Sequence, residues 1–287
     1  MIDYTSRIAR LMDEIVARVP ALSFINTREI LVFARFGRAS RDGAFATCHC
    51  LNLPTSEPTY YFWRDARTDR VVRRSEWVVA KSPTVCVGRQ RVHYLVSFAL
   101  PRFCNQTLAR SQKASLYAGA EPWVAKLDTI VHELYHIDPE EGIRRLARAD
   151  GRYSRRSHAP AFFDHVAGMV QEFLASQPDP DCYEFLRYDF AQLTARYGEI
   201  VGTTFRTFPS FPQRYLERLA VQPPEPAGMT IEPVRVRRRP VHYTGRDLRR
   251  RQFLARSSRV WGAPARVRPA PRARQSGREP IQLSCLS

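Results

Sequence analysis

Two histidines and a glutamate stand close together in the stretch His132-Glu133-Leu134-Tyr135-His136. On a helix, residues four apart lie on one face, one turn apart, so both imidazoles can reach a single metal ion. The glutamate between them can contact a metal-bound water without ligating the metal. This spacing suits zinc-dependent hydrolysis of a peptide bond, which requires a third protein ligand from elsewhere in the chain.

Several residues downstream are candidates for the third ligand. His158 stands in "SHAPAFFDHV", immediately before an expected helix, where the helix would hold it while it projects towards the first pair. His165 lies within that helix, and Glu172 on the same helix would supply a carboxylate instead. Asp138 and Asp164 are further alternatives, and we favour His158 because of its place at the head of the helix.

The elements that must position these residues can be read from the apolar spacing. A helix is expected over about 122 to 137, because proline suits its first turn and apolar residues then recur every three or four positions. Pro139 disfavours its continuation. A polar loop over 138 to 157 follows, and a second helix starts at Pro160.

The rest of the first 220 residues predicts an α+β domain. An amphipathic helix is expected over residues 3 to 18. Short runs rich in valine and aromatic residues, separated by turn residues, predict a strand meander over about 29 to 100. A shorter helix over 190 to 197 and a strand over 199 to 207 complete the expected domain.

The positive charge is concentrated near the C-terminal end. The chain carries a formal net charge of +17, and from residue 233 onward 15 arginines accompany two acidic residues. Residues 221 to 287 are also rich in proline and poor in large apolar residues, so we predict a basic, largely disordered tail with a short helix around 247 to 256. Such a tail either binds the phosphates of a nucleic acid or serves as a solubilising extension.

Composition also bears on the compartment. No apolar run approaches the roughly 18 residues of a membrane helix, and the first residues lack the pattern of a secretion signal. The six cysteines are sparse and irregularly spaced, which favours reduced thiols over a disulfide framework. We therefore expect a cytoplasmic protein without membrane contact, and the sequence does not indicate its oligomeric state.

Three other clusters have both a chemical and a packing interpretation. Cys48 and Cys50 share one face of a strand, and we expect core cysteines there rather than a second zinc site with Cys86, His93 or Cys104. The aromatic run "YYFWR" and the ring of Tyr135 are expected to pack rather than to bind a ligand. Six arginines favour a solvated basic loop over a site for acidic groups: Arg144, Arg145, Arg148, Arg152, Arg155 and Arg156.

Two motifs resemble those of the SprT-like (Spartan-type) zinc metallopeptidases. One is "LDTIVHELYHI" after a strand meander, and the other is the His-x-x-x-Phe of "HAPAF" at the head of the next helix. The resemblance covers roughly residues 1 to 200 in architecture and 127 to 166 in specific motifs. It implies a zincin-like domain that binds Zn²⁺, with catalytic Glu133 and the metal ligands His132, His136 and His158.

The sequence departs from that family in two respects. The interval of 22 positions from His136 to His158 is longer than expected, and the C-terminal region has a single cysteine, Cys285, so it lacks a zinc ribbon. The DNA-repair role of some members is therefore not carried over. The metzincin class is excluded because its pattern needs glycine and histidine where this chain has Pro139 and Gly142.

These observations predict a zinc metalloendopeptidase that acts on a protein or peptide. Glu133 would act as general base towards a zinc-bound water, and a further donor, Tyr153, Arg155 or His165, would stabilise the oxyanion. Substrates associated with nucleic acid would suit the basic tail. The alternative is a catalytically weak nucleic-acid-binding protein that uses a zincin fold as a scaffold.

Overall fold

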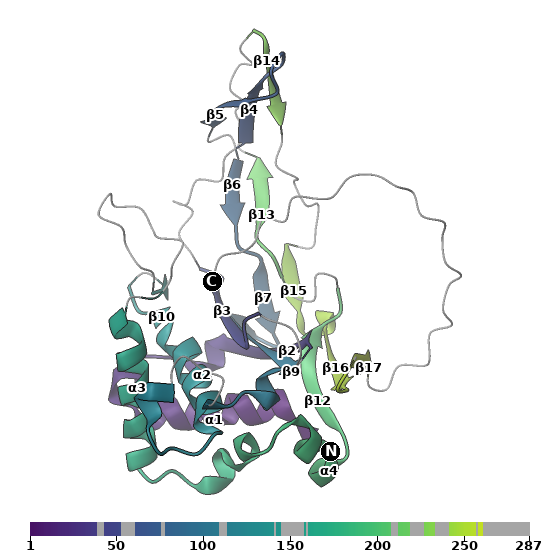
Figure 1. The fold of residues 1–287 in the computed structure, drawn as a ribbon. Coiled ribbons are helices and arrows are strands. Elements are labelled where there is room, and N and C mark those ends of the chain that lie inside the picture. The colour runs from purple at the N-terminus through teal and green to yellow at the C-terminus, as the bar shows by residue number, and fades with distance from the viewer. Residues whose placement is uncertain are drawn as a thin grey trace.

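The computed structural model is a mixed α+β protein with helices at one end and a narrow projection of strands at the other (Figure 1). It describes residues 1–38, 43–52, 61–75, 78–108, 114–140, 142–144, 158, 160–207, 212–218, 227–232, 241–256 and 258–260. Within these ranges the α-helices are α1 (Tyr4–Arg18), α2 (Val124–Tyr135), α3 (Pro160–Ala175) and α4 (Phe190–Tyr197).

The strands divide into several small sheets. Those of the first hundred residues are β1 (Ile2–Asp3), β2 (Ile30–Gly37), β3 (Ala46–Cys50), β4 (Tyr61–Asp65), β5 (Val71–Ser75), β6 (Val78–Lys81), β7 (Thr84–Val87), β8 (Gln90–Val92) and β9 (Tyr94–Pro101). Later strands are β10 (Ile137–Asp138), β11 (Gly142–Ile143), β12 (Ile200–Phe205), β13 (Tyr215–Arg218), β14 (Met229–Glu232), β15 (His242–Thr244), β16 (Leu248–Phe253) and β17 (Ser258–Val260).

A three-stranded sheet separates two hydrophobic cores. Its central strand β9 pairs in parallel with β2 and antiparallel with β3, which forms one edge. Because side chains alternate between the faces, Val96 and Phe98 on one face join the main core beneath the helices. Leu95 and Phe33 on the other face join a smaller core with Phe205. This double burial explains the nearly continuous apolar sequence of β9.

The helices pack against the first face of this sheet. Helix α1 is held at its start by Asp3, whose carboxylate accepts a hydrogen bond from Ser6 N, and buries Ile8, Leu11 and Ile15 completely. Helix α2 is buried along almost its whole length between α1, α3 and the sheet. The expected helices over 3–18, 122–137 and 190–197, the helix starting at Pro160 and the strand over 199–207 are therefore confirmed.

The strand meander is only partly of the expected kind. Sequential hairpins join β4 to β5 and β7 to β8. However, β4, β6 and β7 also pair with β14, β13 and β15, which come from more than a hundred residues later in the chain. Together these strands build the narrow projection at the top of Figure 1. Short apolar runs predict strands but do not identify partners so distant in sequence.

The expectation of a largely disordered tail from residue 221 is wrong for part of that segment. Strand β16 pairs with β12 over six residue pairs, and Phe253 at its end is buried in the main core. The short helix expected around 247 to 256 is likewise wrong, since Leu248–Phe253 is a strand. Residues 261–287 lie outside the described part of the chain. Within that part, no helix is both long and apolar enough to cross a membrane.

Candidate metal centre

Helix α2 brings the first two histidines together. His132 lies in its last turn and His136 is its C-terminal capping residue, whose backbone N–H donates to the carbonyl of His132 at 3.2 Å. The helical turn therefore continues through His136, and the two imidazole centroids lie 4.9 Å apart. Both rings face the same side of the helix, as the four-residue spacing predicts.

His158 reaches the same place from the segment before α3. Its Nε2 lies 3.1 Å from Nε2 of His136, and its ring centroid lies 4.7 Å from that of His132. One ligand atom from each histidine falls within 4.8 Å of the others. Two nitrogens bound tetrahedrally to one Zn²⁺ lie about 3.3 Å apart, so the observed 3.1 Å fits a shared ion. The three histidines can therefore hold a metal ion.

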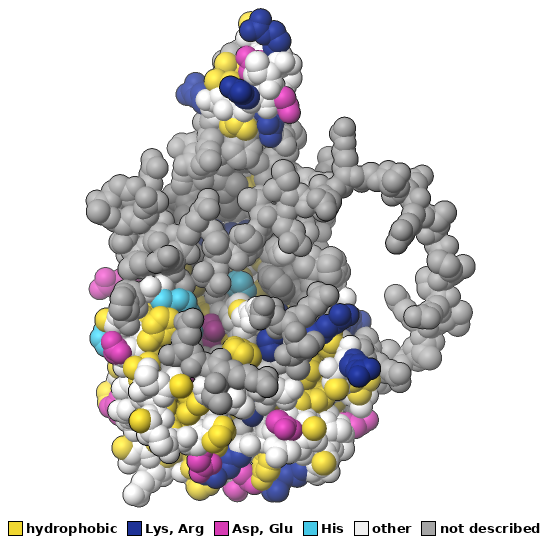
Figure 2. Space-filling view, viewed as in Figure 1, with side chains coloured by type: hydrophobic (Ala, Val, Ile, Leu, Met, Phe, Trp, Pro, Cys, Tyr) yellow, Lys and Arg dark blue, Asp and Glu magenta, His cyan; other side chains and the backbone are white. Residues whose placement is uncertain are grey.

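An aromatic side chain forms a wall of this group. Phe162, one helical turn beyond His158, is 5% exposed, and its ring centroid lies 4.9, 5.0 and 4.6 Å from those of His132, His136 and His158. The His-x-x-x-Phe segment thus supplies both a candidate ligand and this wall. Figure 2 shows histidine side chains beside apolar ones on the helical part of the molecule. The wall restricts the rotation of the rings and excludes water from that side.

Glu133 is buried beside the histidines and close to strand β3. It is 5% exposed. Burial raises the pKa of the Cys48 thiol well above its ordinary value, and the negative charge of Glu133 raises it further. Burial and Arg102 lower the pKa of Arg35, and Glu133 opposes them. Arg35 was not predicted as a neighbour of Glu133, although an arginine inside the apolar run "EILVFARF" could have indicated a partly buried charge.

The alternative third ligands are not part of the histidine group. His165 lies further along α3, and its Nδ1 is 2.9 Å from the hydroxyl of Tyr135. Asp138 lies 3.3 Å from the guanidinium of Arg144. Glu172 and Asp164 are not members of the group found among the described residues. Of the candidate oxyanion donors, Tyr153 and Arg155 lie outside the described residues.

Tyr135 packs as expected and also forms a link between helices. Its ring centroid lies 4.8 Å from that of Phe162 and its hydroxyl contacts His165, so it joins the end of α2 to α3. The packing interpretation of Trp63 in "YYFWR" also holds, since it is 6% exposed beneath the guanidinium of Arg73.

The cysteines of "CHC" belong to the fold. Cys50 is buried, and both Cys48 and Cys50 lie on the face of β3 opposite to His49. The histidine group is the one cluster of three or more potential ligands found in the part of the chain that the structure describes. A second zinc site at these cysteines is therefore not supported. The five described cysteines are free thiols.

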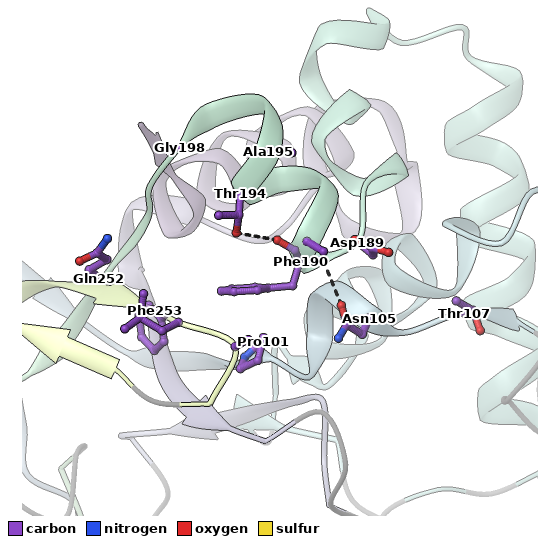
Figure 3. Close-up of a pocket in the computed structure, with 13 residues that line it drawn as sticks. Pro101, Asn105, Thr107, Asp189, Phe190, Thr194, Ala195, Gly198, Gln252 and Phe253 are labelled. Carbon is purple, nitrogen blue, oxygen red and sulfur yellow. Dashed lines mark hydrogen bonds between the residues drawn. The ribbon is translucent and has the colours of Figure 1, made fainter.

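A cavity of about 950 Å³ lies away from the histidines, between α4, the end of β16 and the segment after β9. Figure 3 shows Phe190, Phe253 and Pro101 converging on it from these elements. Near its rim the Asn105 side chain accepts a hydrogen bond from Phe190 N at 2.9 Å. None of its lining residues is a histidine or a cysteine, so this cavity is not part of the candidate metal centre.

Comparisons of the chain with protein-family models, with curated proteins and with solved structures found no match. The resemblance to SprT-like metallopeptidases consequently depends on the motif residues alone.

Proposed function

We propose that this protein is a zinc-dependent peptidase that cleaves a protein or peptide substrate. The proposal is supported mainly by one observation, the convergence of three imidazoles from α2 and the start of α3 next to the buried carboxylate of Glu133. Three neutral nitrogen ligands with a nearby carboxylate are the donor set of hydrolytic zinc sites, which keep a fourth position open. Imidazole is also a common ligand of Zn²⁺.

The chain's own groups divide the work in this proposal. A bound zinc ion would supply Lewis-acid chemistry, acidifying water and polarising the scissile carbonyl. His132, His136 and His158 would hold the ion, and the aromatic wall of Phe162 would keep their rings in place. Glu133 would accept a proton from the attacking water and return it to the leaving amine. Glu133 stands on α2 between His132 and His136, so its carboxylate would lie beside the reacting atoms.

A variant of Glu133 tests the proposal. Glu133→Gln should retain one zinc ion per chain but hydrolyse casein at least about 100-fold more slowly than the parent. The general base is lost in this variant, while the three imidazoles remain. Metal content after dialysis and the release of acid-soluble peptides measure the two properties separately. The parent's activity should also disappear with a chelator and return with added zinc.

Glu172→Gln is the matched control, because Glu172 is an exposed glutamate on α3 outside the histidine group. It should leave both zinc content and hydrolysis unchanged. A Glu133→Gln variant as active as the parent would refute the role given to this carboxylate. A parent chain that binds no zinc would refute the proposed function as a whole.

A further inference from the structure

The short hairpin after the second histidine returns the chain to the end of α2. Strands β10 and β11 pair antiparallel, with Ile137 opposite Ile143 and Asp138 opposite Gly142. Gly142 has a φ of +77°, and a Cβ atom there would lie 3.0 Å from the sulfur of Cys50 on β3. Glycine therefore permits both the left-handed turn and the close approach to the sheet. The next residue of the chain after Ile143 is Arg144.

Arg144 makes four contacts with this helix end. Its backbone N–H donates to the carbonyl of His136 at 2.7 Å, and its Nε donates to the carbonyl of Tyr135 at 2.9 Å. Its Nη1 lies 3.3 Å from a carboxylate oxygen of Asp138, and its guanidinium lies 4.4 Å from the centroid of the Tyr135 ring. Two peptide carbonyls, a carboxylate and a ring within the four residues from Tyr135 to Asp138 are thus held by Arg144.

These contacts occur where a helix is least constrained. The last carbonyls of an α-helix have no donor within the helix, so the final turn frays unless other groups bind them. His136 is the capping residue of α2, so a candidate metal ligand stands in that turn. A cation also interacts favourably with the negative end of the helix dipole. Arg144 supplies the missing donors and the charge together.

We propose that Arg144 is a positioning residue whose side chain holds Tyr135 and Asp138 on either side of His136 and thereby preorganises the histidine group for metal. This inference rests on the proposed zinc site. Groups that orient metal ligands through hydrogen bonds typically change metal affinity by about 10- to 100-fold when removed. In this chain the orientation is applied through the residues on either side of the ligand, while Phe162 and His158 contact its ring.

The test compares zinc affinity in variants of the full chain, measured by competition with a chromophoric chelator. Arg144→Ala keeps the backbone bond to His136 but removes the side-chain contacts with Tyr135 and Asp138, and it should weaken zinc binding about 10- to 100-fold. Arg187→Ala is the matched control, because Arg187 also pairs with an acid, Glu121, and stacks on an aromatic ring, Trp123, but at the opposite end of α2. It should leave zinc affinity unchanged. Arg144→Lys keeps the charge without the planar fork and should give an intermediate affinity.

Two further readouts separate positioning from general stability. The visible absorption of bound Co²⁺ reports ligand geometry and should change in Arg144→Ala but not in Arg187→Ala. Thermal melting of the metal-free chains should show similar losses for both variants. If metal-free Arg144→Ala melts at a much lower temperature than metal-free Arg187→Ala, the test is made on Arg144→Lys instead. An Arg144→Lys variant with the zinc affinity and the Co²⁺ spectrum of the parent would overturn the inference.

The possible failures are distinguishable. A parent chain without zinc affinity overturns the proposed function and this inference together. A parent that binds zinc, combined with an Arg144→Ala variant of equal affinity and unchanged Co²⁺ spectrum, overturns this inference alone.

Discussion

At the residue scale, the histidine group shows which parts of a site sequence spacing can predict. The four-residue interval between His132 and His136 predicts that they share one face of α2. The helix that starts after His158 holds the third imidazole next to them. Arg144 was visible only as one arginine of a basic loop. Its contacts depend on a hairpin of two short strands and on a glycine packed against β3, which residue types alone do not determine.

A prediction about the third ligand belongs to this scale. His158→Ala should lose most of the zinc retained after dialysis, because two imidazoles on one helix leave the ion with too few protein ligands. His165→Ala is the control, since His165 is on α3 but contacts Tyr135 rather than the other histidines. It should keep one zinc per chain. Equal zinc content in both variants would transfer the third ligand to another residue.

At the element scale, helix α2 is joined to the segment before α4 by a buried lysine. Lys126 is 3% exposed, and its Nζ donates to the carbonyls of Leu186 and Tyr188, each at 2.8 Å. Burial lowers its pKa to about 8, although Cys104 and Asp189 oppose the shift. The ordinary lysine pKa of 10.5 applies in the unfolded chain. The bond between these elements is therefore sensitive to pH.

This shift predicts a pH-dependent stability difference. Between about pH 8 and 10.5 the unfolded chain binds a proton that folded Lys126 has released, so this residue makes folding more favourable as pH rises. The free energy of unfolding of the parent should rise relative to that of Lys126→Met by roughly 2–3 kcal/mol across this window. Urea denaturation at a series of pH values measures the difference. Lys81→Met changes a surface lysine that pairs with Glu217, and the free energy of unfolding of the parent should show no such rise relative to this variant. If the parent and Lys126→Met had the same pH dependence of stability, the pH dependence would not come from Lys126.

Strand β16 illustrates an element that sequence patterning hides. Its sequence "LRRRQF" resembles a charged linker, yet Arg249 and Arg251 are half-buried and Arg250 pairs with Asp3 at 2.8 Å. Arginine can bury its aliphatic stem while its head group stays polar, so a run of arginines does not exclude a strand. The partner acid lies 247 residues away in sequence, a distance at which no local pattern reports the contact.

At the scale of the whole molecule, one sheet unites the two ends of the described chain. Strand β12 pairs in parallel with β1 near the N-terminus and antiparallel with β16 near the C-terminal end of the described residues. Gly202 in β12 makes this packing close, since a Cβ atom there would lie 3.1 Å from both Ala34 and Thr5 and 3.4 Å from Phe253. The domain therefore extends at least to β17 rather than ending at residue 220.

This boundary predicts opposite results for two truncations. Removing 261–287 deletes five arginines and one glutamate but no described strand, so the melting temperature and zinc content should match those of the parent. Removing 221–287 also deletes β16 and the buried Phe253, which exposes the edge of β12 and opens the main core, so cooperative thermal unfolding should be lost. Circular dichroism melting measures both. If residues 261–287 contribute to nucleic-acid binding, their removal should also reduce the salt dependence of DNA retention on a filter, because fewer phosphates are neutralised. A cooperative transition in the chain ending at 220 would place the boundary where composition alone first put it.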